Sequence, residues 1–488
     1  MQGGLWLAVL AGKAAIRVCR LLGWGGSTLP GRVARRVHRG VLRGLASQCR
    51  RGTVLISGTN GKTTTTAMLS AILSRAGLSL VHNRTGANLV VGLAAAFVEG
   101  ADLLGRLRAD VGLCEVDEAS VPAAVRELSP GVALVTNFFR DQLDRYGELA
   151  HSVAAVRRGL ELLPEGATAV LNADDPLVAG LGRGLNRPVV YFGLEEAGPG
   201  TGAGFETADI RHCLQCGAEL RYEQVYYAHL GRYSCPGCGL VRPQPQVLAR
   251  DVQPRGTRGS DLVLVHPGGS LRLKLPLPGR FSVYNALAAA SAALSLGVDP
   301  GEVVPGLEGF SPWFGRMESI GLSGRRAFFT LVKNPSGFNQ VIDMVLGDEE
   351  PKPLLIAIND LLADGQDVSW LWDVDFERLA GAAPAIPVVV ASGIRAADLA
   401  VRLKYAGLGP SRLAVEPDLG RALKLGLERV PPGGTLYVLP TYTAMLGLRR
   451  LIHRGGFARP FWEAGRAARA RAGDAGAGGG GGRGGGGG

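Results

Sequence analysis

Seven consecutive residues have the types and the order needed to bind the phosphates of a nucleotide. They read Gly58-Thr59-Asn60-Gly61-Lys62-Thr63-Thr64 and follow the apolar run Val54–Ile56. A buried strand, a glycine loop and a helix start in this order aim backbone N–H groups and the positive end of the helix at anionic oxygens. Lys62 would reach the outer phosphates, and the Thr63 hydroxyl would bind Mg²⁺. The motif is a shortened P-loop, because Ile56 stands where the full pattern has its first glycine. The alternative is an ordinary strand and helix joined by a glycine turn.

Acidic residues follow a second apolar strand, Val111–Val116, and are candidates for the Mg²⁺ ligand. They are Glu115, Asp117 and Glu118. Acids at the carboxyl end of a strand beside a P-loop stand where a metal ligand belongs. We select Glu115, with Asp117 and Glu118 as weaker alternatives, against the simpler interpretation of a solvated acidic turn. A third strand, Val132–Thr136, runs into a polar turn that would complete a nucleotide or metal site.

Two cysteine pairs have the spacing of a metal site. Cys213-Leu-Gln-Cys216 and Cys235-Pro-Gly-Cys238 are separated by eighteen residues, and a glycine follows each pair. Such pairs suit a tetrahedral Cys₄ zinc site. All four ligands would be thiolates with no open position, so the zinc would be structural. The alternative is four incidental thiols in a reduced loop.

The elements that position these residues alternate between short strands and helices, which predicts a doubly wound α/β sheet. We expect a basic, helical N-terminal segment over residues 1–50 and an ATP-binding α/β domain over 51–310, with the cysteine pairs in an insertion at 205–245. A second, Rossmann-like α/β domain would occupy 311–460. The tail at 461–488 becomes almost pure glycine from Ala475, and we expect it to be disordered.

Composition limits the cellular setting. The chain has 488 residues, 46% of them hydrophobic, and a net charge of +11 that is concentrated near its ends. Neither a membrane span nor a signal peptide is evident, because Lys13, Arg17 and Arg20 interrupt the apolar run Leu5–Leu22. We therefore expect a cytoplasmic protein whose cysteines are thiols or metal ligands. The first helix would be amphipathic and basic, packed on the protein body or in contact with the inner face of the plasma membrane.

Three motifs together resemble those of the Mur ligase family. They are Gly58–Thr64, the Thr-Asn-x-x-x-Asp-x-x-Asp-Arg pattern at 136–145, and Gly315-Arg316-Met317-Glu318. Members of that family form amide bonds by converting a carboxylate into an acyl phosphate with ATP. The Cys₄ insertion, the absence of a preceding UDP-sugar domain, and the segments Lys333–Asn339 and Asn359–Asp373 resemble one branch in particular: the ligase subunits of lipid II isoglutaminyl synthase.

The resemblance implies a role for each matching residue. Gly58 to Thr64 would hold ATP, and Thr63 and Glu115 would hold Mg²⁺. Asn285 matches an asparagine near the adenine, and Arg316 matches an arginine that contacts phosphate. Asp367, the second aspartate of Asp364-Gly-Gln-Asp367, matches an aspartate that completes a catalytic triad with a partner subunit. The simpler interpretation of Asp367 is a helix cap.

The implied reaction is ATP-dependent amidation of the D-glutamate α-carboxylate of lipid II to D-isoglutamine, a step of peptidoglycan synthesis. The chain has no pattern typical of a glutaminase, so the resemblance implies a heterodimer in which a GatD-type glutamine amidotransferase supplies ammonia. Some positions depart from the family. Gln142 replaces a histidine ligand of a second Mg²⁺, Ser282 stands where an asparagine is common, and Thr330 and Lys333 replace an aspartate and a histidine.

Two other functions remain open at this stage. A free-standing Mur-type or folate-type ligase would add an amino acid instead of ammonia, but the missing UDP-sugar domain and the Asp364–Trp372 segment argue against it. A nucleic-acid-binding ATPase could combine the P-loop, the zinc ribbon and the basic ends. Residues 205–245 lack a dense basic cluster, so we expect no nucleic acid among the partners.

Overall fold

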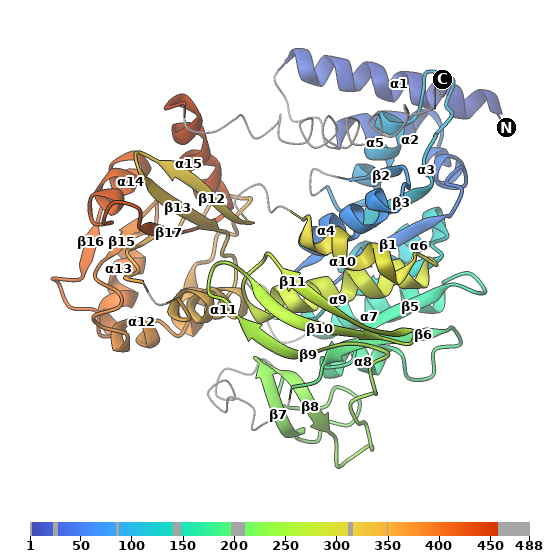
Figure 1. Cartoon of the computed structure of the whole chain (residues 1–488). Helices are drawn as coiled ribbons and strands as arrows, with labels where there is room; N and C mark the ends of the chain where they lie inside the picture. Colours follow the sequence, from blue (N-terminus) through green and yellow to red (C-terminus); the bar gives the residue numbers. More distant parts are fainter. Residues whose placement is uncertain are drawn as a thin grey trace, which may run out of the picture. The chain divides into compact units, whose positions relative to one another are not determined.

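The structure is a computed structural model that describes residues 2–22, 28–83, 87–139, 148–196, 210–310, 316–348 and 350–456. Contacts divide the chain into two units (Figure 1). The first comprises Met1–Phe310 and Asn334–Asp348, and the second comprises Ser311–Lys333 and Glu349–Gly488. Asp141, Gln142, Gly315 and the glycine-rich tail lie outside the described residues.

The first unit is built on a nine-stranded sheet in the order β11-β10-β9-β6-β5-β4-β1-β3-β2. From β2 to β9 every neighbouring pair is parallel. β1, β3 and β4 are buried along their whole length, as expected for central strands of a parallel sheet. The strands are β1 (Thr53–Ser57), β2 (Leu80–His82), β3 (Val111–Glu115), β4 (Val132–Val135), β5 (Thr168–Asn172), β6 (Val189–Leu194), β9 (Val247–Pro254), β10 (Ser260–His266) and β11 (Gly269–Leu275).

The order of these strands places the P-loop at a change of direction in the chain. β1 lies between β3 and β4, so connections leave it toward opposite sides of the sheet. In open α/β sheets, ligands bind outside the carboxyl ends of strands at such a point. The three strands whose ends carry the predicted site residues are therefore neighbours.

One edge of the sheet differs from the predicted doubly wound pattern. β9, β10 and β11 form an antiparallel meander. In β10, buried and half-buried residues alternate strictly, which is the pattern of a strand with one covered face. The parallel α/β prediction is thus confirmed for the centre of the sheet, whereas this mixed edge was not predicted.

Helices cover the sheet of the first unit. Among them, α4 begins at the P-loop and packs against α9 and α10. Residues 334–348, which carry α11, also belong to this unit. Its helices are α1 (Gln2–Leu21), α2 (Leu29–Val37), α3 (Val41–Ala46), α4 (Lys62–Arg75), α5 (Val90–Gly100), α6 (Val121–Leu128), α7 (Glu148–Glu161), α8 (Pro176–Leu181), α9 (Arg280–Ser295), α10 (Pro300–Glu308), α11 (Pro335–Leu346) and the 3₁₀ helix η1 (Glu118–Ser120).

The basic N-terminal segment packs on this unit. α1 contacts α2 and α5. Gly31 of α2 allows a close approach, because a Cβ there would lie 1.8 Å from the carbonyl oxygen of Val91 in α5. Arg20 and Arg35 form ion pairs with Glu99 and Glu127. Packing of the first helix on the body is therefore confirmed. Within the described residues, no helix has both the length and the apolar character needed to span a bilayer.

The cysteine pairs lie in a small two-stranded element. β7 (Arg221–Tyr227) and β8 (Leu230–Ser234) form an antiparallel hairpin between β6 and β9. Cys213 and Cys216 precede the hairpin, and Cys235 and Cys238 follow it. The hairpin forms a sheet of its own.

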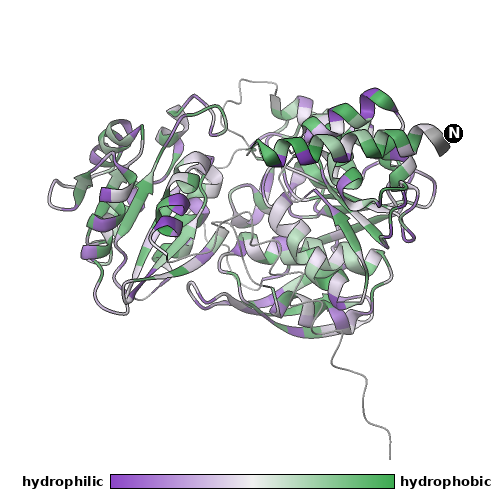
Figure 2. Ribbon diagram, turned by 90° about the horizontal axis from the view of Figure 1, so that it is seen from above, coloured by the Kyte–Doolittle hydropathy of each residue, from purple (hydrophilic) through white to green (hydrophobic). Residues whose placement is uncertain are grey.

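The second unit has a six-stranded sheet in the order β12-β13-β17-β14-β15-β16. β12 and β13 are antiparallel, and the other neighbouring pairs are parallel. In both units the strands are largely hydrophobic in Figure 2. The elements are β12 (Arg316–Leu322), β13 (Arg325–Thr330), β14 (Leu354–Ala357), η3 (Ser369–Asp373), α12 (Glu377–Gly381), β15 (Val389–Ser392), α13 (Ala396–Tyr405), β16 (Leu413–Val415), α14 (Leu419–Glu428), β17 (Thr435–Pro440) and α15 (Tyr442–Arg454).

Candidate nucleotide and metal sites

Two glycines shape the phosphate loop between β1 and α4. Gly58 has φ +121° and Gly61 has φ +85°, a region that side chains disfavour. A Cβ at position 58 would lie 2.4 Å from the Thr136 hydroxyl, and one at position 61 would lie 2.1 Å from Oδ1 of Asn285. Both positions therefore require glycine, and the loop leads into the N-terminus of α4, where backbone N–H groups favour an anion.

The loop after β4 braces the P-loop. The N–H groups of Thr59 and Asn60 donate to the carbonyl and side-chain oxygens of Asn137, over 2.8 and 2.9 Å. In return, the Thr136 hydroxyl donates to the Asn60 carbonyl over 2.8 Å. This turn is the one predicted to complete the site, although the prediction included no role for Asn137. The two hydrogen bonds from the P-loop to the backbone and side chain of Asn137 depend on the tertiary structure.

Lys62 lies at the start of α4 with its ammonium group turned toward acceptors. Nζ is 3.0 Å from Oε1 of Glu118, and it also donates to the carbonyl of Gly58. Both side chains of the ion pair are mostly buried, at 12% and 14% exposure. A phosphate could replace the carboxylate as the partner of Lys62. The prediction considered Glu118 only as a weak metal ligand, whereas the structure makes it the counter-ion of Lys62.

Thr63 and Glu115 meet where the prediction places Mg²⁺. The Thr63 hydroxyl donates to both carboxylate oxygens of Glu115, over 2.9 and 3.1 Å. Glu115 is only 5% exposed, and its backbone is fixed by reciprocal bonds with the Asn83 side chain. A hydroxyl and a carboxylate side by side are the hard oxygen ligands that Mg²⁺ prefers, so this pair fits the ion.

Two asparagines from distant parts of the chain border the same loop. Asn285 of α9 is buried, and its Oδ1 accepts from the Thr65 hydroxyl over 3.3 Å. Asn334 donates from Nδ2 to Oδ1 of Asn60 over 3.2 Å, while its own Oδ1 caps α11 through the N–H of Gly337. Asn334 belongs to the distinctive 333–339 segment but was not assigned to the site.

Arg316, which is predicted to contact phosphate, lies outside the first unit. It begins β12, in the second unit, where its backbone pairs with Thr330. Its side chain lies outside the described part of the chain, so its phosphate contact stays a prediction.

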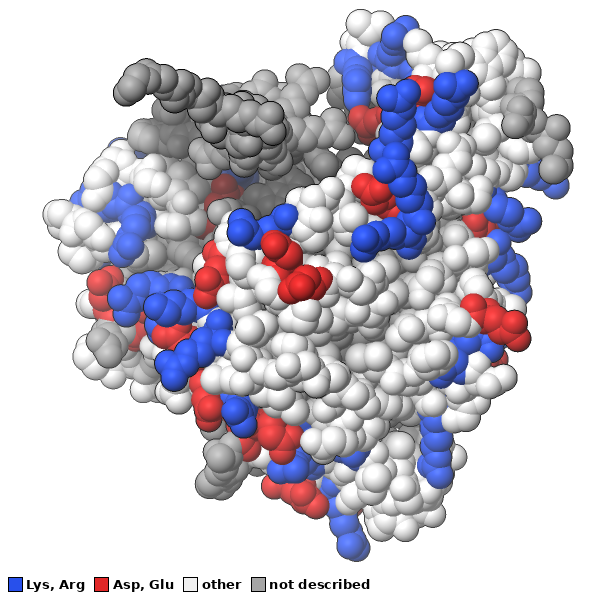
Figure 3. All heavy atoms as spheres, turned by 45° about the vertical axis from the view of Figure 1, so that its right-hand side comes forward, with Lys and Arg blue, Asp and Glu red and all other residues white. Residues whose placement is uncertain are grey.

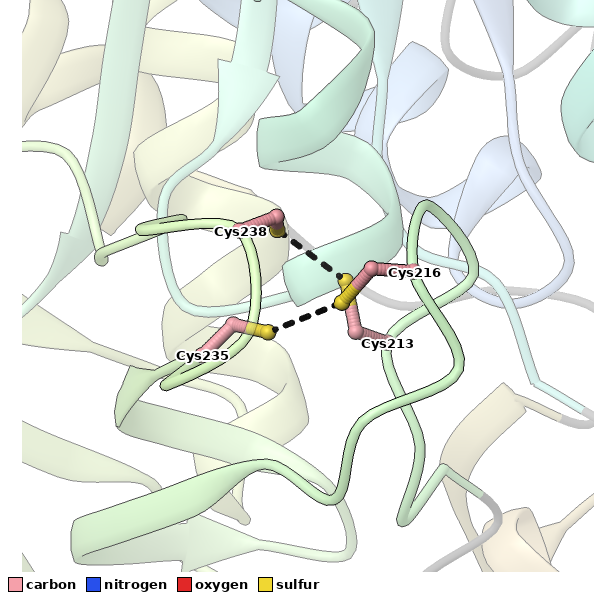
Figure 4. Close-up of side chains that lie close together, drawn as sticks. All are labelled: Cys213, Cys216, Cys235 and Cys238. Carbon is pink, nitrogen blue, oxygen red and sulfur yellow. Dashed lines mark hydrogen bonds between the residues drawn. The ribbon is translucent and has the colours of Figure 1, made fainter.

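The four cysteines of the two pairs converge (Figure 4). Their sulfur atoms all lie within 4.8 Å of one another, with Cys213 to Cys238 at 3.6 Å and Cys216 to Cys235 at 3.4 Å. Tetrahedral Zn–S bonds of about 2.3 Å put neighbouring sulfurs about 3.8 Å apart. The donor set and its spacing therefore fit a zinc ion.

A buried ion pair joins the segment after this cluster to the sheet. Arg242, 6% exposed, donates from Nε to Oδ1 of the fully buried Asp174 over 2.5 Å. Asp174 also accepts from the Tyr284 hydroxyl over 2.6 Å and from the N–H of Leu194 over 2.7 Å. Burial raises the pKa of Asp174, against the opposing effect of these partners. Tyr284 precedes Asn285, so the same network reaches the helix that borders the P-loop.

The hairpin makes a second link through Asp175 and His229. Asp175 accepts from the N–H of Phe138, next to the bracing Asn137, over 2.8 Å. His229, between β7 and β8, is fully buried with Nε2 3.5 Å from Oδ2 of Asp175, and its ring lies 4.8 Å from that of Phe139. The cysteine insertion is therefore packed directly behind the loop that braces the nucleotide site.

Asp367 lies in the second unit, at the start of η3. Its Oδ1 accepts from the N–H of Ser369, the first residue of η3, over 2.7 Å, but the N-cap position of η3 is Val368 and not Asp367. The loop before it is held by Asp364, which is buried and accepts from the backbone and hydroxyl of Thr443. Asn359 also donates to that hydroxyl over 2.9 Å. These bonds fix the loop but leave the catalytic role of Asp367 a prediction.

Comparison with known proteins gives matches over nearly the whole chain. Residues 56–223 match the family model of the Mur ligase middle domain, and residues 331–445 match the MurT ligase C-terminal family. The subunit MurT of the glutamine-hydrolysing lipid II isoglutaminyl synthase of Streptococcus pneumoniae is 34% identical over 91% of this chain and 96% of that protein. Its counterpart from Staphylococcus aureus is 32% identical over 92% of this chain and 98% of that protein.

Solved structures show the same fold. A pseudomurein peptide ligase type C from Methanothermus fervidus superposes with a TM-score of 0.62 at 25% identity, covering 83% of this chain and 79% of that one. MurF from Acinetobacter baumannii gives 0.63 at 19% identity, covering 86% and 80%. With a relative of more than 30% identity matched over almost its full length, the chain belongs to the MurT family of the Mur ligases, which are ATP-dependent ligases.

Proposed function

We propose that this chain is the ligase subunit of a glutamine-hydrolysing lipid II isoglutaminyl synthase, which acts in peptidoglycan synthesis. The names of its MurT relatives describe that activity. The observation that carries the proposal is the phosphate cradle, in which Lys62, Thr63 and Glu115 converge at the end of β1. That site can activate a carboxylate with ATP, which is the first half of the reaction.

In the first step, a carboxylate oxygen of the D-glutamyl residue attacks the γ-phosphorus of ATP. The bond to the β-γ bridging oxygen breaks, and ADP leaves with its electron pair. Lys62 and the N–H groups at the start of α4 stabilise the negative charge on the phosphate oxygens. Thr63 and Glu115 would hold Mg²⁺, which neutralises phosphate charge and keeps the reacting groups in line.

In the second step, ammonia attacks the acyl carbon of the acyl phosphate, phosphate leaves, and the surplus proton passes to solvent. The product is D-isoglutamine, the α-amide of the D-glutamyl residue. We assign the supply of ammonia to a GatD-type glutamine amidotransferase that forms a heterodimer with this chain. Asp367 would orient a histidine of that partner and stabilise its imidazolium form. The loop bonds of Asp364 and Asn359 support this role, because an aspartate donated across an interface must be held in place.

We assign a structural zinc ion to Cys213, Cys216, Cys235 and Cys238. The ion would tie the two ends of the hairpin together. Because the hairpin packs behind the loop that braces the P-loop, loss of zinc should weaken ATP binding as well as local stability.

The test is ATP-dependent amidation of lipid II by the chain, either with ammonium or with glutamine and the partner subunit. We compare the wild type with Asp367→Asn and with Asp373→Asn, an exposed aspartate at the other end of η3. Asp367→Asn should lose glutamine-dependent amidation by at least about a hundredfold and keep the ammonium reaction. Asp373→Asn should keep both.

Two results would contradict the assignment. Equal loss of both reactions in Asp367→Asn would place the residue in the ligase site or the fold. A wild type that amidates with neither nitrogen source, yet hydrolyses ATP when nucleic acid is added, would replace the ligase proposal by a nucleic-acid-dependent ATPase.

A further inference from the structure

The outer face of α1 exposes large apolar side chains. The inner residues Ala8, Val9 and Cys19 are buried against the body of the first unit. By contrast, exposure of the outer apolar residues ranges from 41% to 87%. They gather near the two ends of the helix, with Trp6 and Leu7 at its start, Val18 and Leu21 at its end, and Leu22 directly after it. Green segments interspersed with purple ones mark this helix in the view from above in Figure 2. Among the described residues, α1 therefore packs through its inner side and leaves these apolar side chains exposed.

A short turn places two more leucines beside the start of this helix. Leu103 and Leu104 are 56% and 62% exposed. The Asp102 carboxylate accepts from the N–H groups of Leu104 and Arg106, over 2.8 and 2.9 Å, so the turn is folded by its own bonds. A Cβ on Gly105 would be 3.6 Å from Cα of Trp6. The two leucines thus add exposed apolar surface next to the start of α1.

Basic residues accompany this surface. The chain has no aspartate or glutamate before Glu99, while Lys13, Arg17 and Arg20 lie on α1 itself. Arg20 and Lys13 contact Glu99, which docks the helix, whereas Arg17 is exposed. Arg106 and Arg108 are exposed next to the leucine turn. Acidic side chains lie among the basic ones near the top of Figure 3, where α1 is located, so the charge is positive but not continuous.

We propose that this surface, formed by the outer face of α1 and the Leu103–Leu104 turn, binds the interface of an anionic lipid bilayer. Leucine and tryptophan side chains on a folded helix and turn, flanked by arginines, suit insertion between lipid headgroups. The positive charge complements anionic lipid. It argues against a protein partner whose groove is neutral or contains few acidic residues. The inference extends the proposed function, because a lipid-linked substrate lies in such a bilayer, but its test does not require the reaction.

The test is flotation of the full chain with vesicles of phosphatidylcholine alone and of phosphatidylcholine mixed with phosphatidylglycerol. The wild type should float with the mixed vesicles. Leu103→Asp/Leu104→Asp should reduce its partition at least about tenfold, and Leu21→Glu, at the most exposed apolar position of α1, should also reduce it. Arg17→Gln should reduce partition about fivefold, and only into the anionic vesicles.

The matched control is Leu361→Asp/Leu362→Asp, a second pair of adjacent exposed leucines in the other unit. This control should bind vesicles like the wild type, and thermal unfolding should show that all variants are folded. The proposal is overturned if the wild type stays unbound with both vesicle types, or if folded Leu103→Asp/Leu104→Asp and Leu21→Glu both bind like the wild type. A dimer that the leucine variant dissociates would instead make the surface a contact between two copies.

A second readout separates this inference from the proposed function. Amidation of lipid II dispersed in detergent should be unchanged in Leu103→Asp/Leu104→Asp, whereas amidation of lipid II in vesicles should fall with the partition. If the wild type binds vesicles but amidates lipid II in neither form, the proposed function fails and the membrane surface stands.

Discussion

Arg242→Met should reveal how strongly the cysteine insertion is anchored to the body of the first unit. Arg242 lies near the end of the insertion, four residues after Cys238, and its guanidinium pairs with the buried carboxylate of Asp174. Methionine keeps much of the side-chain volume but removes the positive charge. Asp174 would keep its bonds from Tyr284 and Leu194 and lose its only strong charge partner among the described residues.

The expected loss of stability follows from the burial of both partners. Breaking a buried ion pair by removing one member costs about 3–5 kcal/mol, because the other charge stays buried without compensation. For a unit of this size, one kcal/mol corresponds to a change in melting temperature of about 2 °C. The melting temperature of the first unit should therefore fall by about 6–10 °C.

The pH dependence of the stability of this variant provides a second test of the buried ion pair. Burial raises the pKa of Asp174, while Arg242 acts to lower it. Without the arginine, the pKa of Asp174 in the native state should rise further above its value in the unfolded chain. The native state then binds more protons than the unfolded state, so its stability increases as the pH falls. The loss of stability caused by Arg242→Met should therefore become smaller as the pH falls from about pH 8 to about pH 5.

Thermal unfolding followed by circular dichroism measures both effects. The matched control is Arg221→Met, because Arg221 is exposed on β7, and its melting temperature should stay within about 1 °C of the wild type. If the melting temperature of Arg242→Met falls no further than that of this control, the buried ion pair does not stabilise the unit as proposed. If the loss of stability in Arg242→Met grows as the pH falls, the assigned direction of the Asp174 pKa shift is wrong.

Two further predictions concern the nucleotide site and the cysteines. Glu115→Gln should raise the Mg²⁺ concentration needed for half-maximal ATP-dependent activity at least about tenfold. Asp117→Asn should change that concentration little, because Asp117 accepts from the N–H of Ala119 and an amide oxygen can keep this bond. Equal effects of the two variants in a Mg²⁺ titration would exclude Glu115 as the specific ligand. Burial raises the pKa of Cys49 to about 11 and raises that of Cys114 as well, so at about pH 8 neither should react with iodoacetamide. The four cysteines of the two pairs should react once a chelator is present. Mass spectrometry of the labelled peptides would contradict this if Cys49 or Cys114 were modified first.

The local pattern of residues was enough to predict the glycine turn between β1 and α4 and the convergence of the four paired cysteines. A glycine at a positive φ, a lysine and a threonine at a helix start, and paired cysteines at short spacing are constraints within a few residues of one another. Gly58 and Gly61 do adopt positive φ values, and the four cysteine sulfurs do converge. Glu115 could also be selected in advance, because it ends a buried strand and parallel strands end at the same edge.

Only the tertiary structure decided which distant residues meet these motifs. Glu118 became the counter-ion of Lys62, and Asn334 reached Asn60 across more than two hundred residues of sequence. Likewise, Arg242 and Asp174 form a pair that neither local segment indicates. Such contacts depend on strand order and helix packing, and the period of the side chains within one element carries no information about either. The sequence by itself therefore determined the chemistry available at each loop, and the order of the strands decided which of those loops share a site.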